Sequence, residues 1–284
     1  MLTVLESIKL STEFLEKKGV ESPRINAELL LAKILNCKRL DLYLKFDRPL
    51  SDEEIKLYRE FLSRRSKFEP LQYILGSVEF YGFEFTVDNS VLIPRPETEI
   101  LVEQIINSVN KSDKLKILDI GTGSGIIAVC LAKHLSESSI IAIDSSIDAL
   151  NTARRNSDLN NVSKGIEFIE WNIIKGEFFP ESDFDIVVSN PPYVSIEEFK
   201  NLRPELKIYE PSIALTDNSD GLSFYRIISL KAKELLKSGG KLFLEIGMGQ
   251  SEKVKEILLS NNYSSIELKK DYLNIDRVIS GVHN

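Results

Sequence analysis

The stretch KILDIGTGSG at residues 116–125 decides the fold of this chain. It opens with an apolar, β-branched run typical of a buried strand and continues with glycines at alternate positions. Glycine lets a backbone turn sharply and lie close to a ligand. A G-x-G-x-x-G dinucleotide fingerprint would need glycine where the chain has Ile126, and the P-loop lysine is also missing. The stretch therefore predicts a strand followed by a different kind of glycine-rich binding turn.

The next strand is expected to end in a carboxylate. The run IIAI at residues 140–143 is strand-like, and Asp144 closes it. A carboxylate in this place can accept hydrogen bonds from two ribose hydroxyls. The glycine turn alone is a weak signal, because structural turns share it. Strand, glycine turn, helix, strand and acid together indicate an adenosine-type cofactor.

Strand-like and helix-like segments alternate beyond Lys114. This order predicts an α/β fold with a doubly wound, mostly parallel, seven-stranded Rossmann-like sheet and helices on both faces. The expected strands lie near residues 116–120, 140–144, 166–170, 184–189, 240–246, 264–269 and 276–280.

The second chemical element is SNPPY at residues 189–193, directly after an expected buried strand. Ligands of open α/β sheets bind at the carboxyl ends of the strands. The two prolines lack N–H groups, and Pro191 pushes Asn190 toward extended geometry. A rigid amide beside carbonyl acceptors suits a planar NH2 group, and Tyr193 adds a flat apolar face. Taken alone, the stretch is equally compatible with a proline-rich turn.

Residues 1–76 predict a small all-helical N-terminal domain. Thr3 and Ser51 each precede a glutamate by three residues, which is the capping-box pattern. Ser22 stands before a proline, as a helix cap would. The basic cluster of Arg64, Arg65 and Lys67 is interpreted as a solvent-exposed helix end, with a partner contact as the alternative.

The rest of the chain predicts two further parts. Residues 77–92 read as a β-hairpin linker around Gly82, and residues 93–284 as the α/β domain.

Composition excludes several classes of protein. The 284 residues are 43% hydrophobic and 28% charged, with a net charge of −7 and a pI near 5.2. A chain with this net negative charge has no overall positive electrostatic potential that would attract it to nucleic acid or to an anionic membrane. Cys37 and Cys130 stand in helix-like apolar contexts and are expected to be small buried hydrophobes in a reducing compartment, not a disulfide or a metal set. The N-terminal stretch carries charges throughout and lacks a signal-peptide core, so we expect a cytoplasmic protein.

These stretches carry a family resemblance. Residues 119–125, Asp144 and Asn190-Pro191-Pro192-Tyr193 resemble class I methyltransferases that use S-adenosylmethionine and modify amide or exocyclic amino nitrogens. The chain also resembles the peptide chain release factor glutamine N5-methyltransferases over essentially its whole length. The stretches that carry this second likeness are PLQYILG at 70–76, FYG at 80–82, PRPET at 94–98 and Glu210-Pro211. PRPET is the most family-specific of them, whereas NPPY is shared with adenine-N6 DNA methyltransferases.

The resemblance implies a reaction and a set of site residues. It implies methyl transfer from S-adenosyl-L-methionine, with S-adenosyl-L-homocysteine as product, to the glutamine side-chain nitrogen in the Gly-Gly-Gln loop of release factors. The implied cofactor contacts are Asp119, Gly121, Thr122, Gly123, Ser124, Gly125, Asp144, Trp171 and Asn190. The implied catalytic residues are Asn190, Pro191, Pro192 and Tyr193, with no metal. Glu170 departs from the family, where a shorter acid is common.

The implied partners are release factors, recognised by the N-terminal domain, with no direct nucleic-acid or membrane binding and a monomeric enzyme. Two alternatives remain at this stage. The first is an adenine-N6 nucleic-acid methyltransferase, which the acidic balance and the lack of a basic, aromatic-rich recognition segment disfavour. The second is a non-catalytic cofactor-binding adaptor, which would have no need of an intact NPPY stretch.

Overall fold

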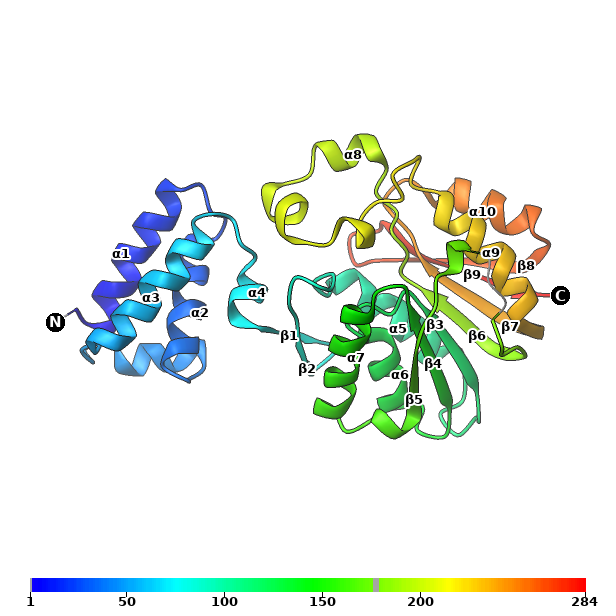
Figure 1. Cartoon of the computed structure of the whole chain (residues 1–284), viewed down its shortest axis with the longest axis horizontal. Coiled ribbons are helices and arrows are strands. Elements are labelled where there is room, and N and C mark those ends of the chain that lie inside the picture. The colour runs from blue at the N-terminus through cyan, green and yellow to red at the C-terminus, as the bar shows by residue number, and fades with distance from the viewer. Residues whose placement is uncertain (1, 176–178) are drawn as a thin grey trace. The chain divides into compact units, whose positions relative to one another are not determined.

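The computed structural model describes residues 2–175 and 179–284, and its internal contacts divide the chain into two compact units (Figure 1). The first unit consists of Met1–Ser77 and Arg203–Tyr209, and the second of Val78–Leu202 and Glu210–Asn284. Each unit has an apolar core of its own. Among the described residues, no helix combines the length and the apolar character that crossing a membrane requires.

The first unit is a helical bundle. Both predicted capping boxes are confirmed, because Thr3 and Ser51 accept hydrogen bonds from the backbone N–H groups of Glu6 and Glu54. Apolar side chains from α1, α2 and α3 fill its core. The elements of this unit are α1 (Val4–Lys17), α2 (Pro23–Ile34), η1 (Arg39–Lys45), α3 (Asp52–Arg65), α4 (Leu71–Leu75) and η4 (Glu205–Tyr209).

Ser22 occupies the N-cap position of α2 ahead of Pro23, as predicted, but its side chain does not cap the helix. Ser22 precedes α2 in left-handed backbone geometry, with φ of 48°, and its side chain makes no capping hydrogen bond. The buried Asn26 holds the turn instead, since Nδ2 of Asn26 donates to the carbonyls of Glu21 and Ser22, at 3.0 Å each. The turn is therefore fixed by a side chain one helical turn further on.

The predicted exposure of the basic cluster is wrong for Arg65, which is only 5% exposed. Its guanidinium donates to Oδ1 of Asn26 at 2.6 Å and to the carbonyl of Glu69 at 3.0 Å, and it pairs with Glu205. A buried guanidinium needs such partners to offset its lost hydration. Glu205 comes from the second stretch of this unit, so Arg65 joins sequence-distant parts of one core.

The second unit contains the predicted seven-stranded, doubly wound sheet. Its order is β5-β4-β3-β6-β7-β9-β8, with parallel pairing from β5 through β7 and antiparallel pairing of β9 with both neighbours. The strands are β3 (Lys116–Ile120), β4 (Ser139–Asp144), β5 (Ile166–Glu170), β6 (Phe184–Ser189), β7 (Leu236–Glu245), β8 (Tyr263–Lys270) and β9 (Asp276–His283). β7 begins earlier than expected, because Leu236 pairs with Phe184 ahead of an irregularity in the ladder. A separate two-stranded sheet pairs β1 (Ser77–Phe80) with β2 (Phe83–Thr86).

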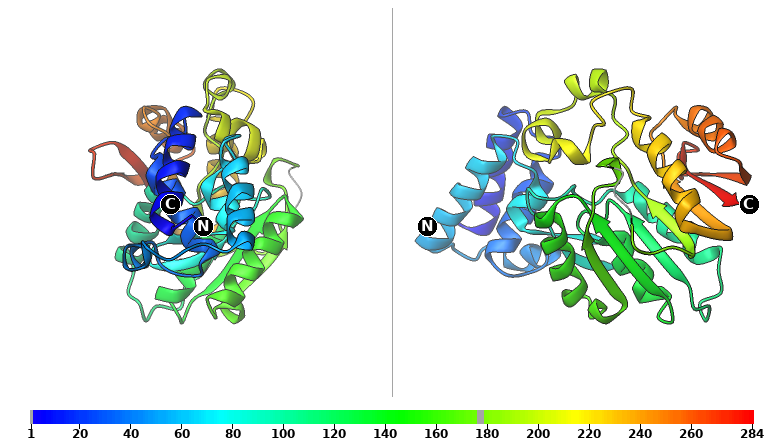
Figure 2. Two further views of the ribbon diagram at one scale, coloured as in Figure 1. Left: turned by 90° about the vertical axis from the view of Figure 1, so that its left-hand side faces the viewer. Right: turned by 45° about the vertical axis from the view of Figure 1, so that its right-hand side comes forward.

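Helices cover both faces of the large sheet (Figure 2). On β3, Ile117 packs into the cluster that contains α5 and α6, whereas Leu118 packs into the cluster that contains α9 and α10. This alternation is the period-two pattern of a strand buried on both sides. The longer helices are α5 (Pro96–Asn107), α6 (Ile126–His134), α7 (Ile147–Leu159), α9 (Ser223–Leu235) and α10 (Ser251–Ser260). The short ones are η2 (Ser163–Gly165), η3 (Ile173–Lys175), α8 (Ile196–Lys200) and η5 (Ser212–Ala214).

Candidate active site

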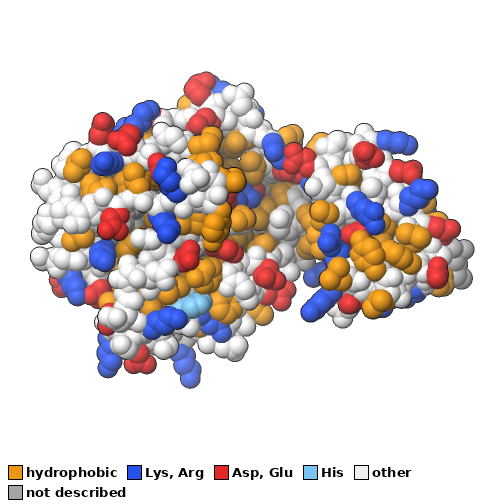
Figure 3. Space-filling model, turned by 180° about the vertical axis from the view of Figure 1, so that it is seen from behind, with side chains coloured by type: hydrophobic (Ala, Val, Ile, Leu, Met, Phe, Trp, Pro, Cys, Tyr) orange, Lys and Arg blue, Asp and Glu red, His pale blue; other side chains and the backbone are white. Residues whose placement is uncertain are grey.

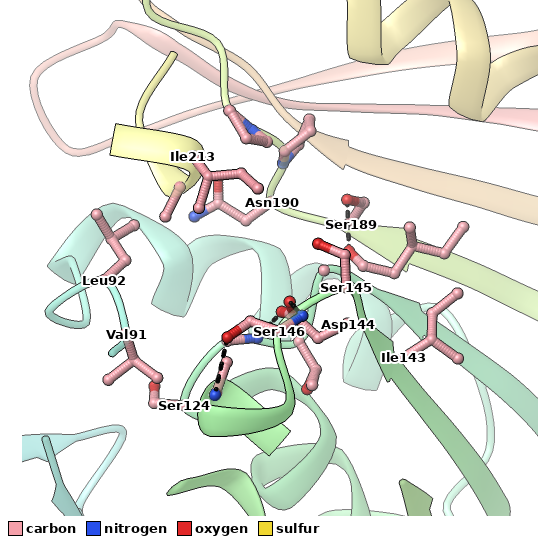
Figure 4. Close-up of a pocket in the computed structure, with 18 of the residues that line it drawn as sticks. Val91, Leu92, Ser124, Ile143, Asp144, Ser145, Ser146, Ser189, Asn190 and Ile213 are labelled. Carbon is pink, nitrogen blue, oxygen red and sulfur yellow. Dashed lines mark hydrogen bonds between the residues drawn. The ribbon is translucent and has the colours of Figure 1, made fainter. Parts of the chain in front are cut away.

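A pocket lies at the carboxyl edge of the sheet, entirely within the second unit (Figure 4). Parallel strands end at the same edge, so the loops after β3, β4, β5 and β6 converge there. The lining includes residues 121–124, 144–146, 171–174 and 189–192. The glycine turn and the NPPY stretch, far apart in sequence, therefore share one cavity.

The glycine turn is shaped by backbone geometry that favours glycine. Gly121, Gly123 and Gly125 have φ of +72°, +56° and +81°. A Cβ at Gly121 or Gly123 would meet nothing within 4 Å, whereas one at Gly125 would lie 3.0 Å from the Cβ of Ala153. The first two glycines thus keep the backbone open toward the pocket, and the third permits close packing against α7.

Asp144 connects the end of β4 to the glycine turn. One carboxylate oxygen accepts from the N–H of Gly123 at 2.9 Å, and the other accepts from the N–H of Ser146 at 2.9 Å. Burial raises the pKa of Asp144, and these backbone donors oppose the shift. Since Asp144 also lines the pocket, its remaining lone pairs face a ligand site.

Two buried polar atoms beside the pocket lack partners in the described structure. They are Oδ1 of Asp119 and Nε1 of Trp171. The other oxygen of Asp119 accepts from the Thr122 hydroxyl at 2.7 Å. Burial raises the pKa of Asp119 to about 7. Buried polar groups are normally paired, and Trp171 lines the pocket, so its N–H points to a ligand that carries an acceptor.

The Asn190 side chain is held by a chain of hydrogen bonds. Its Nδ2 donates to the Thr98 hydroxyl at 3.1 Å, and that hydroxyl donates to Oε2 of Glu245 at 2.6 Å. Burial raises the pKa of Glu245 to about 7. Gln250 holds the neighbouring backbone, because its Nε2 donates to the Tyr193 carbonyl at 2.9 Å.

The PRPET segment meets Glu210-Pro211 at the same pocket. Nη2 of Arg95 lies 2.6 Å and 2.8 Å from the two carboxylate oxygens of Glu210, and Arg95 and Pro211 both line the cavity. Two of the stretches that carry the family resemblance are thus joined by an ion pair in which one guanidinium nitrogen contacts both carboxylate oxygens.

Most of the predicted site residues line the pocket. The lining contains Gly121, Thr122, Gly123, Ser124, Asp144, Trp171, Asn190, Pro191 and Pro192. Asp119, Gly125 and Tyr193 do not line it. The ring of Tyr193 packs against the apolar cluster of α9 and α10, and burial raises the pKa of its hydroxyl. Its role as a face for the acceptor stays a prediction.

Sequence reasoning missed Glu245, Gln250 and the hydrogen bonds of Thr98. A usable signal existed for Glu245, which closes an apolar strand as Asp144 does. No local pattern connects it to Thr98, which lies 147 residues away in the chain.

Solved structures with low sequence identity share the fold. A methyltransferase from Pyrococcus furiosus is 20% identical with a TM-score of 0.51, covering 72% of this chain and 91% of that one. The catalytic domain of hMettl16, solved in complex with MAT2A 3′UTR hairpin 6, is 20% identical with a TM-score of 0.55. The match covers 79% of this chain and 82% of that one.

Sequence comparisons match both parts of the chain. The PrmC N-terminal domain matches residues 6–76, and the methyltransferase small domain matches residues 96–206. The release factor glutamine methyltransferase of Fusobacterium nucleatum is 42% identical over 97% of this chain and 77% of its own length. The Chlorobaculum tepidum protein of the same name is 39% identical over 98% of this chain and 96% of its own length. Because these relatives are 39% and 42% identical over nearly the whole of this chain, the protein belongs to the release factor glutamine methyltransferase family.

Proposed function

We propose that this protein transfers a methyl group from S-adenosylmethionine to the side-chain amide nitrogen of the glutamine in the Gly-Gly-Gln loop of peptide chain release factors. The observation that carries the proposal is the position of the Asn190 carboxamide, which lines the same pocket as the glycine turn and Asp144. The relatives named above supply the substrate class.

The pocket fits the cofactor on the glycine side. S-adenosylmethionine supplies, when bound, an activated methyl group on a positively charged sulfonium. The backbone at Gly121 and Gly123 lies open to it, and Asp144 would accept from the ribose hydroxyls. Trp171 offers an aromatic face and an unpaired N–H.

The opposite wall is suited to an amide acceptor. Because Nδ2 of Asn190 is used by Thr98, Oδ1 is left to accept one N–H of the substrate glutamine. Pro191 is buried, and no donor among the described residues takes up its carbonyl, which can accept the other N–H. Holding both N–H bonds would orient the nitrogen lone pair, which is otherwise delocalised into the carbonyl. Alignment of this kind lowers a barrier by about 7–11 kcal/mol in favourable cases.

The same two oxygens stabilise the transition state. Positive charge develops on the acceptor nitrogen, and the carbonyl dipoles of Asn190 and Pro191 are aimed at it. No side chain in the lining is assigned as a general base, so the proton leaves to water after transfer.

The test is methyl transfer from labelled cofactor to an intact release factor, with the labelled residue mapped by mass spectrometry. We expect label on the loop glutamine and none when that glutamine is replaced by alanine. Asn190→Ala should lower kcat by about 10²–10³-fold, which is the loss typical of removing one group that stabilises the transition state. The matched control is Asn151→Ala, on the exposed side of α7. Label on nucleic acid alone, or normal turnover of Asn190→Ala, would reject the proposal.

We further infer a cytoplasmic monomer that binds the release factor without direct nucleic-acid contact. The net charge of −7 supports the absence of nucleic-acid contact, as does the mixing of acidic and basic side chains on the face drawn in Figure 3. The helical unit is proposed to bind the protein substrate at a distance from the glutamine.

A further inference from the structure

We propose that Thr98 and Glu245 are positioning residues that hold the Asn190 carboxamide in the one orientation that leaves its oxygen facing the substrate amide. The inference rests on the proposed function, since it names what fixes the acceptor-binding group of that site.

The polarity of the three side chains sets the orientation. An ionised carboxylate only accepts hydrogen bonds, so the Thr98 hydroxyl must be the donor in its 2.6 Å contact with Glu245. A hydroxyl has one hydrogen, and its oxygen can then only accept from Asn190, 3.1 Å away. The group that Asn190 turns toward Thr98 is therefore NH2.

The alternative orientation would be unproductive. A carboxamide turned by 180° places NH2 where Oδ1 stands and presents a donor to the N–H of the substrate glutamine. The two orientations are nearly equal in shape, so hydrogen bonding has to select between them. Thr98 and Glu245 are each 1% exposed, so water does not compete for these bonds.

Glu245 is itself fixed from several elements. The Tyr193 hydroxyl lies 3.4 Å from its other carboxylate oxygen, and the Tyr225 hydroxyl donates to its backbone carbonyl at 3.1 Å. Two charged groups also face it, Glu97 on α5 and Arg277 on β9. The Glu245 carboxylate therefore cannot turn away from Thr98 without losing the Tyr193 hydroxyl, and Tyr225 on α9 holds the Glu245 backbone in place.

This arrangement depends on pH. Burial raises the pKa of Glu245 to about 7, with a further rise from Glu97 that Arg277 opposes. A protonated Glu245 becomes a donor toward Thr98, and the hydroxyl then has a hydrogen to give to Asn190 Oδ1. The productive orientation is expected to be lost as the pH falls through about 7.

The experiment compares Thr98→Val, which removes the hydroxyl, with Thr98→Ser, which keeps it. We expect Thr98→Val to lower kcat by about ten- to a hundredfold, the range for losing a hydrogen bond to a charged partner. The KM for the substrate and the Kd for the cofactor should stay within about threefold, because only alignment is lost. Thr98→Ser should restore most of kcat.

Two readouts separate positioning from a structural role. The kcat of the wild-type enzyme should rise with pH through about 7, and this inflection should be absent from Glu245→Gln, because the Gln side chain does not titrate. In a ¹H–¹⁵N spectrum, the Asn190 side-chain NH2 signal, assigned from Asn190→Ala, should shift in Thr98→Val and stay in place in Thr98→Ser.

Unchanged kcat and an unshifted NH2 signal in Thr98→Val would overturn the inference. So would an inflection that persists in Glu245→Gln. If the wild-type enzyme labels an acceptor other than the release-factor glutamine, the proposed function fails, and the same variants on that acceptor still decide the role of Thr98 and Glu245.

Discussion

Asp144 gives the clearest case of one side chain with two tasks. It holds the glycine turn through Gly123, and it faces the pocket where ribose hydroxyls would bind. Asp144→Asn keeps one acceptor oxygen but removes the charge. Because a charge-assisted hydrogen bond contributes about 1.5–3 kcal/mol, cofactor affinity should fall about ten- to a hundredfold.

Calorimetric titration with S-adenosylmethionine measures this change. The control is Asp148→Asn, an exposed acid in the first turn of α7, which should bind the cofactor like the wild-type enzyme. Unchanged affinity in folded Asp144→Asn would remove the ribose assignment.

The buried acid Glu245 should also affect stability. Burial raises its pKa from 4.5 to about 7, so the folded state binds its proton more tightly than the unfolded chain does. The associated stability is fully present below pH 4.5 and is lost as the pH rises through about 7. Glu245→Gln, which does not titrate, should lose less stability than the wild-type enzyme between pH 5 and pH 8.

Urea unfolding across this range supplies both free-energy curves. Only the difference between them is assigned to Glu245, because the other acids are common to both proteins. Parallel curves would mean that Glu245 is already ionised in the folded state at low pH.

The elements themselves were largely predictable. β3, β5 and β6 begin and end where expected, because each is rich in β-branched and aromatic residues and is bounded by polar or turn residues. The burial of Arg65 could not be predicted, since its partner Glu205 comes from a distant stretch of the chain, and the left-handed backbone of Ser22 left its side chain without a capping bond. The orientation of the Asn190 side chain could not be predicted either, because the residues that fix it, Thr98 on a helix and Glu245 on a strand, are distant in sequence.

The loop before α9 has to leave room for the NPPY stretch. Gly221 has φ of +78°, and a Cβ there would lie 2.5 Å from the Tyr193 carbonyl oxygen. Gly221→Ala should therefore displace that carbonyl and lower kcat by more than about tenfold, as small misplacements of aligned groups do. Cofactor affinity should change little, because Gly221 does not line the pocket.

The matched control is Gly239→Ala. Gly239 has nearly the same φ, +79°, but a Cβ there would meet nothing within 4 Å. Both variants bear the left-handed strain of about 1–2 kcal/mol, and only Gly221→Ala adds the clash. Equal kcat values in the two variants would show that strain alone is responsible.

Arg65 on α3 tests the first unit in the same way. Arg65→Ala leaves Asn26 and Glu205 without their partner and should destabilise the protein by about 2–3 kcal/mol. The exposed Arg59→Ala on the same helix should stay within about 0.5 kcal/mol of the wild type. Chemical denaturation followed by circular dichroism measures both, and equal stabilities would contradict the packing described for Arg65.

For the whole molecule, the main question is what the helical unit contributes to catalysis. If it binds the release factor, a short Gly-Gly-Gln peptide lacks the remote contacts that align a weak nucleophile. Its kcat/KM should be lower than that of the intact factor by at least about a hundredfold. Steady-state kinetics on both acceptors gives this ratio, and equal values would leave the helical unit as a stabilising element.

Shortening the enzyme is a less direct test of the same question. Without residues 1–76, Glu205 loses Arg65 and Tyr209 loses the Lys67 carbonyl to which its hydroxyl donates. A loss of activity would then mix substrate recognition with damage to residues 203–209.

The division of the chain also governs what a single cut in the backbone would do. The polypeptide passes between the two units three times, after residues 77, 202 and 209. A protease that cleaves after residue 77 would leave the first unit composed of two separate polypeptides, because residues 203–209 remain with the larger fragment. We therefore expect the two fragments to copurify after cleavage. Fragments that are produced separately should reassemble by complementation, because the first unit needs both residues 1–77 and residues 203–209.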